Sequence, residues 1–143
     1  MGIRPDGHGI WTSIVSGGQL CRLPFFLEYD AGSEPVSELA NRIGTYNWFV
    51  TLGGPPWPAL VWLSNAVREE ELRQLRTVGS QSPGRRRIPI ATASREYATS
   101  LGLSPAGAVW QLQGYDTPRL SLDEIATTLD LPDPYDVVHH SDG

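Results

Sequence analysis

Three acidic side chains near the N-terminus are the residues of this chain best suited to chemistry. Glu28 and Asp30 follow the apolar residues 25–27, and this pattern predicts a buried strand that ends in two carboxylates. Residues two apart on a strand point to the same face, so both acids face the same way. An ionised carboxylate at the edge of a core is costly unless it is paired or bound to a metal. The pattern therefore indicates a divalent-metal site, or else a polar strand edge whose acids cap turns and the next helix.

A predicted hairpin brings Asp6 to the same place. Residues 10–15 and 20–30 have the composition of two strands, and a glycine pair lies between them. A two-residue turn at this pair makes paired residue numbers sum to about 35, which places Asp6 opposite residue 29, between the two acids. Pro24 indicates a bulge or an edge, and a bulge would bring Asp6 opposite one of the two acids.

The composition is that of a globular protein without a basic surface. The chain has 143 residues, 40% of them hydrophobic and 19% charged, and this size predicts one domain with its own core. The net charge is −5, so any contact with DNA must be local. All 11 basic residues are arginines, which excludes a Schiff base, a P-loop lysine and any other catalytic lysine.

The sequence predicts a cytoplasmic protein that does not enter the membrane. No stretch approaches the ~20 apolar residues that a transmembrane helix needs. The first residues lack the apolar region of a signal peptide. The single cysteine, Cys21, has no partner for an internal disulfide, and the sequence places it in a core strand.

Strands and helices alternate after the hairpin. Apolar periodicity and turn residues predict helices at 33–50, 66–78 and 94–101, and strands at 59–63, 88–91 and 108–112. The whole order is β-β-α-β-α-β-α-β. This order predicts an α/β fold in which helices flank a mixed sheet.

Local signals give finer predictions for the first two helices. Ser33 is a good N-cap for the first helix. In the second helix, Glu69 and Arg73 are four residues apart and are expected on the solvent side. Leu72 and Leu75 are then expected on the buried side.

The chain is expected to divide into a domain over residues 1–113 and an appendix over residues 114–143. Ser121 and Glu124 have the spacing of a capping box, which predicts a short helix over about 122–129. The polar, proline-containing end of the chain predicts a disordered tail. We expect the appendix to pack on the domain or on a partner.

A series of short motifs resembles the replication-relaxation family of actinobacterial plasmids and integrative elements. The motifs are Arg-Pro-Asp-Gly at 4–7, Phe-Leu-Glu-Tyr-Asp at 26–30, Gly-Ser-Glu at 32–34, Arg42, Tyr46, Pro-Ala-Leu-Val-Trp-Leu at 58–63, Ile-Ala-Thr at 90–92 and Gly-Ala-Val-Trp at 107–110. The domain of that family is similar to the PD-(D/E)xK nuclease fold. The resemblance therefore implies a restriction-endonuclease-like sheet.

The resemblance also implies a Mg²⁺ site at Asp6 and Glu28, with the carbonyl of Tyr29 as a third ligand. Mg²⁺ prefers oxygen ligands from one or two carboxylates, together with phosphate and water. Asp30 stands where the nuclease fold has its lysine, and Arg42 takes the place of a basic residue in the following helix. Arginine clamps phosphate but stays protonated, so it is unsuited to proton transfer. These differences from the family pattern argue against hydrolysis more than they argue against the fold.

Four arginines are candidates for contacts with DNA. Arg42 is interpreted either as a phosphate contact or as the surface partner of Glu38, which lies four residues before it. A run of three neighbours is interpreted either as a grip on DNA phosphates or as a solvated loop. This run is Arg85, Arg86 and Arg87.

Three functions are compatible with these residues. The resemblance implies an accessory protein of plasmid replication or conjugal DNA processing, which holds DNA, or a relaxase or replication protein, without necessarily cutting. The alternative is an active Mg²⁺-dependent endonuclease or nickase that uses Asp6, Glu28 and Asp30, with the metal lowering the pKa of the attacking water. The third is a non-catalytic interaction module or a truncated fragment, since a winged-helix segment often precedes this domain in the family.

Overall fold

An N-terminal hairpin begins the sheet. The computed structural model describes residues 5–79 and 88–131, and its first strands are β1 (Gly7–Ile14) and β2 (Leu20–Tyr29). They pair antiparallel with residue numbers that sum to 34, from 7 with 27 to 14 with 20. The predicted two-residue turn, and the register based on it, are wrong because the connection is longer and contains a short 3₁₀ helix (Ser16–Gly18). The observed register places Asp6 opposite Glu28, one step beyond the first strand pair.

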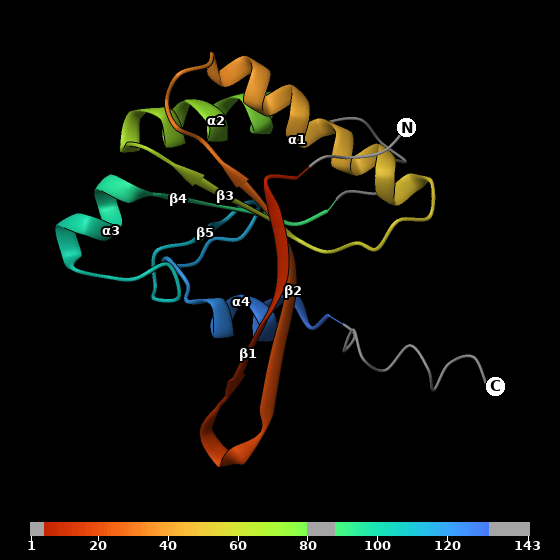
Figure 1. Ribbon diagram of the computed structural model, residues 1–143, viewed down its shortest axis with the longest axis vertical. Coiled ribbons are helices and arrows are strands. Elements are labelled where there is room, and N and C mark those ends of the chain that lie inside the picture. Colours follow the sequence, from red (N-terminus) through yellow and green to blue (C-terminus); the bar gives the residue numbers. More distant parts are fainter. Residues whose placement is uncertain (1–4, 80–87, 132–143) are drawn as a thin grey trace.

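The sheet has five strands in the order β1-β2-β3-β4-β5 (Figure 1). β3 (Ala59–Leu63) pairs parallel with β2 and with β4 (Ile90–Ser94), and β5 (Gln111–Leu112) pairs antiparallel with β4. All five residues of β4 are buried, and four of the five in β3. Such continuous burial is typical of parallel strands that are covered on both faces. The predicted α/β class with a mixed sheet is confirmed.

Pro24 causes no bulge, because the pairing of β1 with β2 runs through it without interruption. The N–H of Phe26 donates to the carbonyl of Pro58 at 2.9 Å, so the nitrogen of Pro24, two residues earlier, points to the same side of β2. β3 pairs with β2 only from Phe26 onward. Pro24 therefore lies at a local edge, where the missing N–H removes no bond of the sheet.

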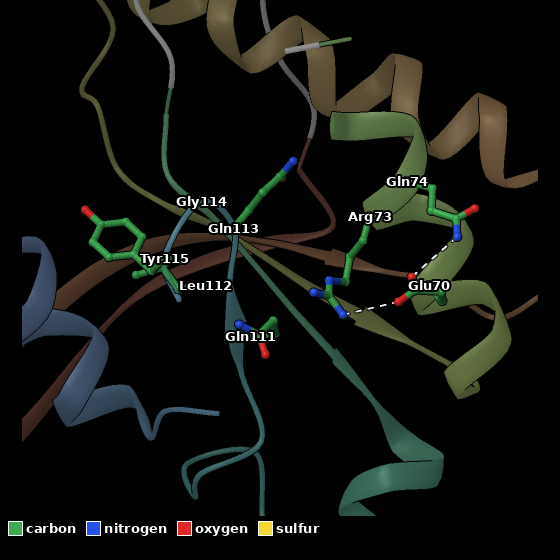
Figure 2. Close-up of a pocket in the computed structure, with 8 residues that line it drawn as sticks. All are labelled: Glu70, Arg73, Gln74, Gln111, Leu112, Gln113, Gly114 and Tyr115. Carbon is green, nitrogen blue, oxygen red and sulfur yellow. Dashed lines mark hydrogen bonds and ion pairs between the residues drawn. The ribbon is translucent and has the colours of Figure 1, made fainter. Parts of the chain in front are cut away.

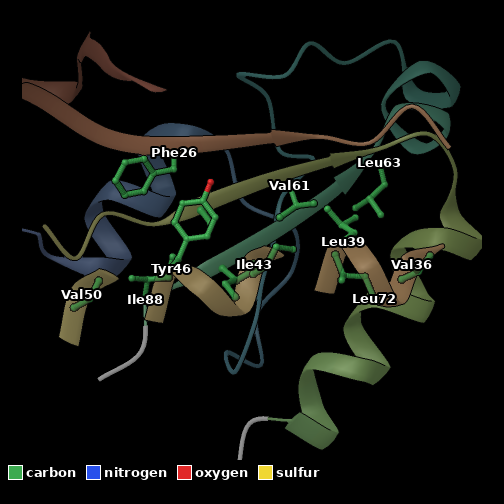
Figure 3. Close-up of a cluster of buried hydrophobic side chains, with 12 residues drawn as sticks. Phe26, Val36, Leu39, Ile43, Tyr46, Val50, Val61, Leu63, Leu72 and Ile88 are labelled. Carbon is green, nitrogen blue, oxygen red and sulfur yellow. The ribbon is translucent and has the colours of Figure 1, made fainter. Parts of the chain in front are cut away.

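Two helices cover one face of the sheet. α1 (Val36–Thr51) follows β2, and α2 (Ala66–Gly79) follows β3. Their apolar side chains and those of the sheet form one buried cluster (Figure 3). From α1, it contains Val36, Leu39, Ile43, Tyr46 and Val50. All of these except Tyr46 belong to the apolar periodicity that predicts this helix.

The other two helices pack on the opposite face. α3 (Arg95–Leu101) ends at Gly102, whose φ of 66° is the left-handed conformation that glycine adopts easily. α4 (Leu122–Leu129) begins with the predicted capping box between Ser121 and Glu124. The side chain of Ile125 belongs to the same buried cluster as Leu23 of β2. None of the described helices is long and apolar enough to cross a membrane.

Three finer predictions for α1 and α2 are wrong. Pro35, not Ser33, is the N-cap of α1, and no side chain caps that end. Leu75 is 44% exposed, although Leu72 is buried as predicted. Glu69 is buried rather than solvated, because it has partners that lie far away in the sequence.

Candidate functional site

Glu28 is a buried carboxylate with one unsatisfied oxygen. It lies near the end of β2 on the face that α1 covers, and only 2% of its surface is exposed. The hydroxyl of Tyr46, from α1, donates a hydrogen bond to Oε1 at 2.6 Å. Oε2 is fully buried and has no hydrogen-bond partner in the described part of the chain. Among the described residues, the cation beside it is Arg42, whose Nη2 is 3.5 Å from Oε2, too far for a good charge-assisted bond.

Asp6 supplies a second carboxylate beside Glu28. Asp6 is exposed, and its Oδ2 accepts a hydrogen bond from the backbone N–H of Tyr29 at 2.7 Å. This bond holds the acid against the end of β2. The structure therefore brings together the two residues that the resemblance implies as metal ligands, one buried and one open to solvent.

The environment of Glu28 disfavours its charge. Burial raises the pKa of this carboxyl above its ordinary value, and the nearby charge of Asp6 raises the pKa further. The bond from Tyr46 and the more distant Arg42 lower the pKa but do not outweigh these effects. A buried carboxylate that is short of partners is a group that a cation would stabilise.

Arg42 connects this pair of acids to a third one. Its Nη1 donates to both carboxylate oxygens of Glu34, each at 2.7 Å. Glu34 lies just before α1 and Arg42 in its second turn, so the pair spans the start of the helix. The alternative in which Arg42 pairs with Glu38 is wrong, because the guanidinium faces Glu34 and Glu28 instead.

Asp30 has a separate partner. Nε and Nη2 of Arg68, from α2, donate to its two oxygens at 2.6 and 2.9 Å. Nη2 also donates to the carbonyl of Glu34 at 2.7 Å. Burial alone would raise the pKa of Asp30, but the bonds from Arg68 and from the N–H of Gly32 outweigh burial and lower it. These two bonds from Arg68 join the end of β2 to α2, and they compensate the charge of the buried Asp30 carboxylate.

The other predicted DNA contacts fall outside the described part of the chain. These are Arg85, Arg86 and Arg87. The described residues contain no group of three or more His, Cys, Asp or Glu side chains that could hold a metal. Mg²⁺ needs only one or two protein carboxylates when phosphate and water complete its shell, so Asp6 and Glu28 are the described acids that could hold such an ion.

The structure also contains a second buried charge network, which the sequence patterns did not predict. Nη1 and Nη2 of Arg119 donate to the two oxygens of Glu69, both at 2.9 Å. Thr92 donates to Glu69 at 2.7 Å, and the guanidinium of Arg119 lies 4.4 Å from the ring centre of Tyr97. These side chains come from α2, β4, α3 and the segment before α4. No local pattern links them, since Glu69 and Arg119 are 50 residues apart.

A cleft of about 390 Å³ lies between α2 and β5 (Figure 2). Arg73 and Glu70 form an ion pair on its α2 side, and Gln111 and Gln113 line the β5 side. None of the acids predicted for the site lines this cleft. The candidate site therefore lies at the unsatisfied oxygen of Glu28 and not in this cleft.

Comparison of the chain with protein-family models, with curated proteins and with solved structures finds no match in any of the three.

Proposed function

We propose that this protein is a replication-relaxation-type accessory factor of plasmid or mobile-element DNA processing, which holds DNA through a Mg²⁺ ion at Asp6 and Glu28. The observation that carries the proposal is that the buried Oε2 of Glu28 accepts no hydrogen bond from the described residues and lies next to a second carboxylate. A divalent cation there would supply the missing partner and a positive charge for a DNA phosphate. The family resemblance of the motifs around these acids supports the choice of DNA as the ligand.

The residues around the pair have distinct tasks in this proposal. Tyr46 holds Oε1 of Glu28, which orients the carboxylate and leaves Oε2 for the cation. Asp6 is exposed, so the site is open to a phosphate from solvent. Arg42 is about two-fifths exposed and lies within 3.5 Å of Glu28, so its guanidinium can contact the same phosphate.

The residues around Asp6 and Glu28 favour holding DNA over cutting it. The chain has no lysine to polarise an attacking water. Asp30, at the corresponding position, is committed to Arg68 through two short bonds. Arg42 stays protonated and is clamped by Glu34, so it does not accept a proton.

Metal and DNA binding test this proposal together. Mn²⁺ binding is followed by electron paramagnetic resonance, and binding of a labelled DNA duplex by fluorescence anisotropy, in Mg²⁺ or in EDTA at matched ionic strength. The wild type should bind Mn²⁺ and should bind DNA more tightly in Mg²⁺. Glu28→Gln and Asp6→Asn should lose both effects, whereas Glu38→Gln, an exposed glutamate of α1, should keep them. Equal metal binding by the wild type and Glu28→Gln would refute the site.

An active Mg²⁺-dependent nickase is the second candidate, because two neighbouring carboxylates are also the minimal metal site for phosphodiester hydrolysis. Supercoiled plasmid incubated with Mg²⁺ or Mn²⁺ distinguishes the two candidates. Nicking by the wild type and not by Glu28→Gln would favour the enzyme. Metal-dependent DNA binding without nicking above the variant's background would favour the accessory factor.

A further inference from the structure

The backbone hydrogen bonds of β2 show to which side the N–H and C=O groups of each hairpin residue point. The N–H of Phe26 donates to Pro58 on the β3 side, and the N–H of Tyr29 donates to Asp6 on the β1 side. Even-numbered residues of β2 therefore direct their backbone bonds to β3, and odd-numbered residues direct theirs to β1.

The same alternation leaves one row of backbone groups in β1 facing outward. Because paired numbers sum to 34, even-numbered residues of β1 lie opposite even-numbered residues of β2 and exchange no bonds with them. Their N–H and C=O groups point to the free side of β1, the first strand of the sheet. The register with β2 uses none of these groups, and no turn or loop bond between described residues uses them either. The residues are His8, Ile10, Thr12 and Ile14.

β1 has none of the devices that usually protect such an edge. The strand is eight residues long, contains no Asp, Glu, Lys, Arg or Pro, and has no bulge in its register. Proteins commonly block exposed edges with a lysine, a proline or a bulge, because a bare edge is a template for another strand. Ile14, at the end of β1, is 74% exposed, and the hairpin extends away from the rest of the sheet (Figure 1).

We propose that β1 pairs with β1 of a second copy of this chain, antiparallel across a two-fold axis at Trp11. In this register, His8 lies opposite Ile14 of the second copy, and Ile10 lies opposite Thr12. All the outward N–H and C=O groups of both strands are then paired, and the two sheets become one continuous sheet.

The sequence of β1 favours a second copy over an unrelated strand as the occupant. The register is self-complementary, because each outward group finds its partner in the identical strand. It places the β-branched Ile10 beside Thr12 on one face and Trp11 beside its own counterpart on the other, which are favourable cross-strand pairs. The strand contains no Asp, Glu, Lys or Arg, so no charges of these residues face each other along the edge.

Substitutions at Thr12 test the pairing. Thr12→Pro removes an outward N–H and no bond to β2, and Thr12→Lys keeps every backbone bond but adds a charge at the edge. Thr12→Val keeps the N–H and the shape of the side chain, and is the matched control. The mass of each full-length protein is measured by light scattering and by sedimentation velocity over a concentration series in EDTA, with circular dichroism to check folding.

The wild type and Thr12→Val should be dimers, and Thr12→Pro and Thr12→Lys should be folded monomers at the same concentrations. If Thr12→Pro does not fold, Thr12→Lys alone decides the result. A wild type that stays monomeric over the whole series, or a dimer that persists in Thr12→Lys, would overturn the proposal. The dimer does not depend on the metal site, so Glu28→Gln should dimerise like the wild type.

Discussion

Tyr46 donates its hydroxyl hydrogen to Oε1 of Glu28 over 2.6 Å, between two side chains that are almost fully buried. The two residues come from α1 and β2, so the bond joins the first helix to the strand end that carries the candidate site. It is the sole hydrogen bond that the described residues give to this carboxylate. Arg42 approaches the same carboxylate at a longer distance, with 3.5 Å between its Nη2 and Oε2 of Glu28.

Tyr46→Phe should destabilise the fold by about 1–3 kcal/mol, the cost of leaving a buried polar group without its partner. The ring stays in place, so the loss reflects the hydrogen bond and not the packing. Chemical unfolding in urea measures the free energy of unfolding. Tyr97→Phe is the control, because the described residues give that hydroxyl no hydrogen bond, and it should change stability by less than about 0.5 kcal/mol. Equal effects of the two changes would show that the bond to Glu28 contributes nothing.

Glu28→Gln should stabilise the metal-free protein, and increasingly so as the pH rises. Burial and Asp6 raise the pKa of Glu28, so folding favours its protonated form. Below the ordinary glutamate pKa of about 4.3, the carboxyl is neutral in both states and the variant has little advantage. Above that value, the wild type loses stability as the pH rises through the raised pKa, whereas the neutral amide does not.

Urea unfolding in EDTA at a series of pH values measures this difference. Glu38→Gln, at an exposed position of α1, should give a difference that changes little with pH. A Glu28→Gln variant that is less stable than the wild type at neutral pH would mean that the charge is already compensated in the metal-free protein. In that case the reason for placing a cation there would disappear.

Local sequence patterns predicted the elements of the fold but not the connections between them. The strand at 59–63, the apolar stripe of α1 and the capping box at Ser121 depend on residues a few positions apart, and all three are found in the structure. The register of the hairpin depended on the turn at Gly17 and Gly18. A 3₁₀ helix there, with both glycines at positive φ, shifts every pair by one residue.

In the candidate site too, the sequence predicted which residues lie together but not which partners they bind. The sequence located Asp6, Glu28 and Asp30 near one strand end, but it did not show that Arg68 pairs with only one of them. The fork from Arg68 depends on how α2 crosses β2, 38 residues away along the chain. Glu69 was expected in water because Arg73 follows it by one helical turn, and its long-range partner gives no signal in the sequence. Contacts of this kind require the packed structure.

Asp30→Asn should cost about 3 kcal/mol at neutral pH, the low end of the range for breaking a buried ion pair, since Arg68 keeps some exposure. Bonds from Arg68 and Gly32 outweigh burial and lower the pKa of Asp30, so the ionised form is favoured by folding. This stabilisation is present above the ordinary aspartate pKa of about 3.9 and is lost as the pH falls through the lowered pKa. The difference between wild type and variant should therefore shrink in acid. A difference that stays constant from neutral to acidic pH would contradict the role of the charge.

Arg119→Ala should destabilise the fold by about 3–5 kcal/mol, because it leaves the carboxylate of Glu69 buried without a cation. Adding Glu69→Gln to that variant removes the uncompensated charge and should restore part of the loss. Glu70→Ala is the control, since its ion pair with Arg73 is exposed and should contribute no more than about 1 kcal/mol. The four proteins are compared by urea unfolding at neutral pH. If Arg119→Ala cost no more than Glu70→Ala, the network between α2 and the segment before α4 would not hold these elements together.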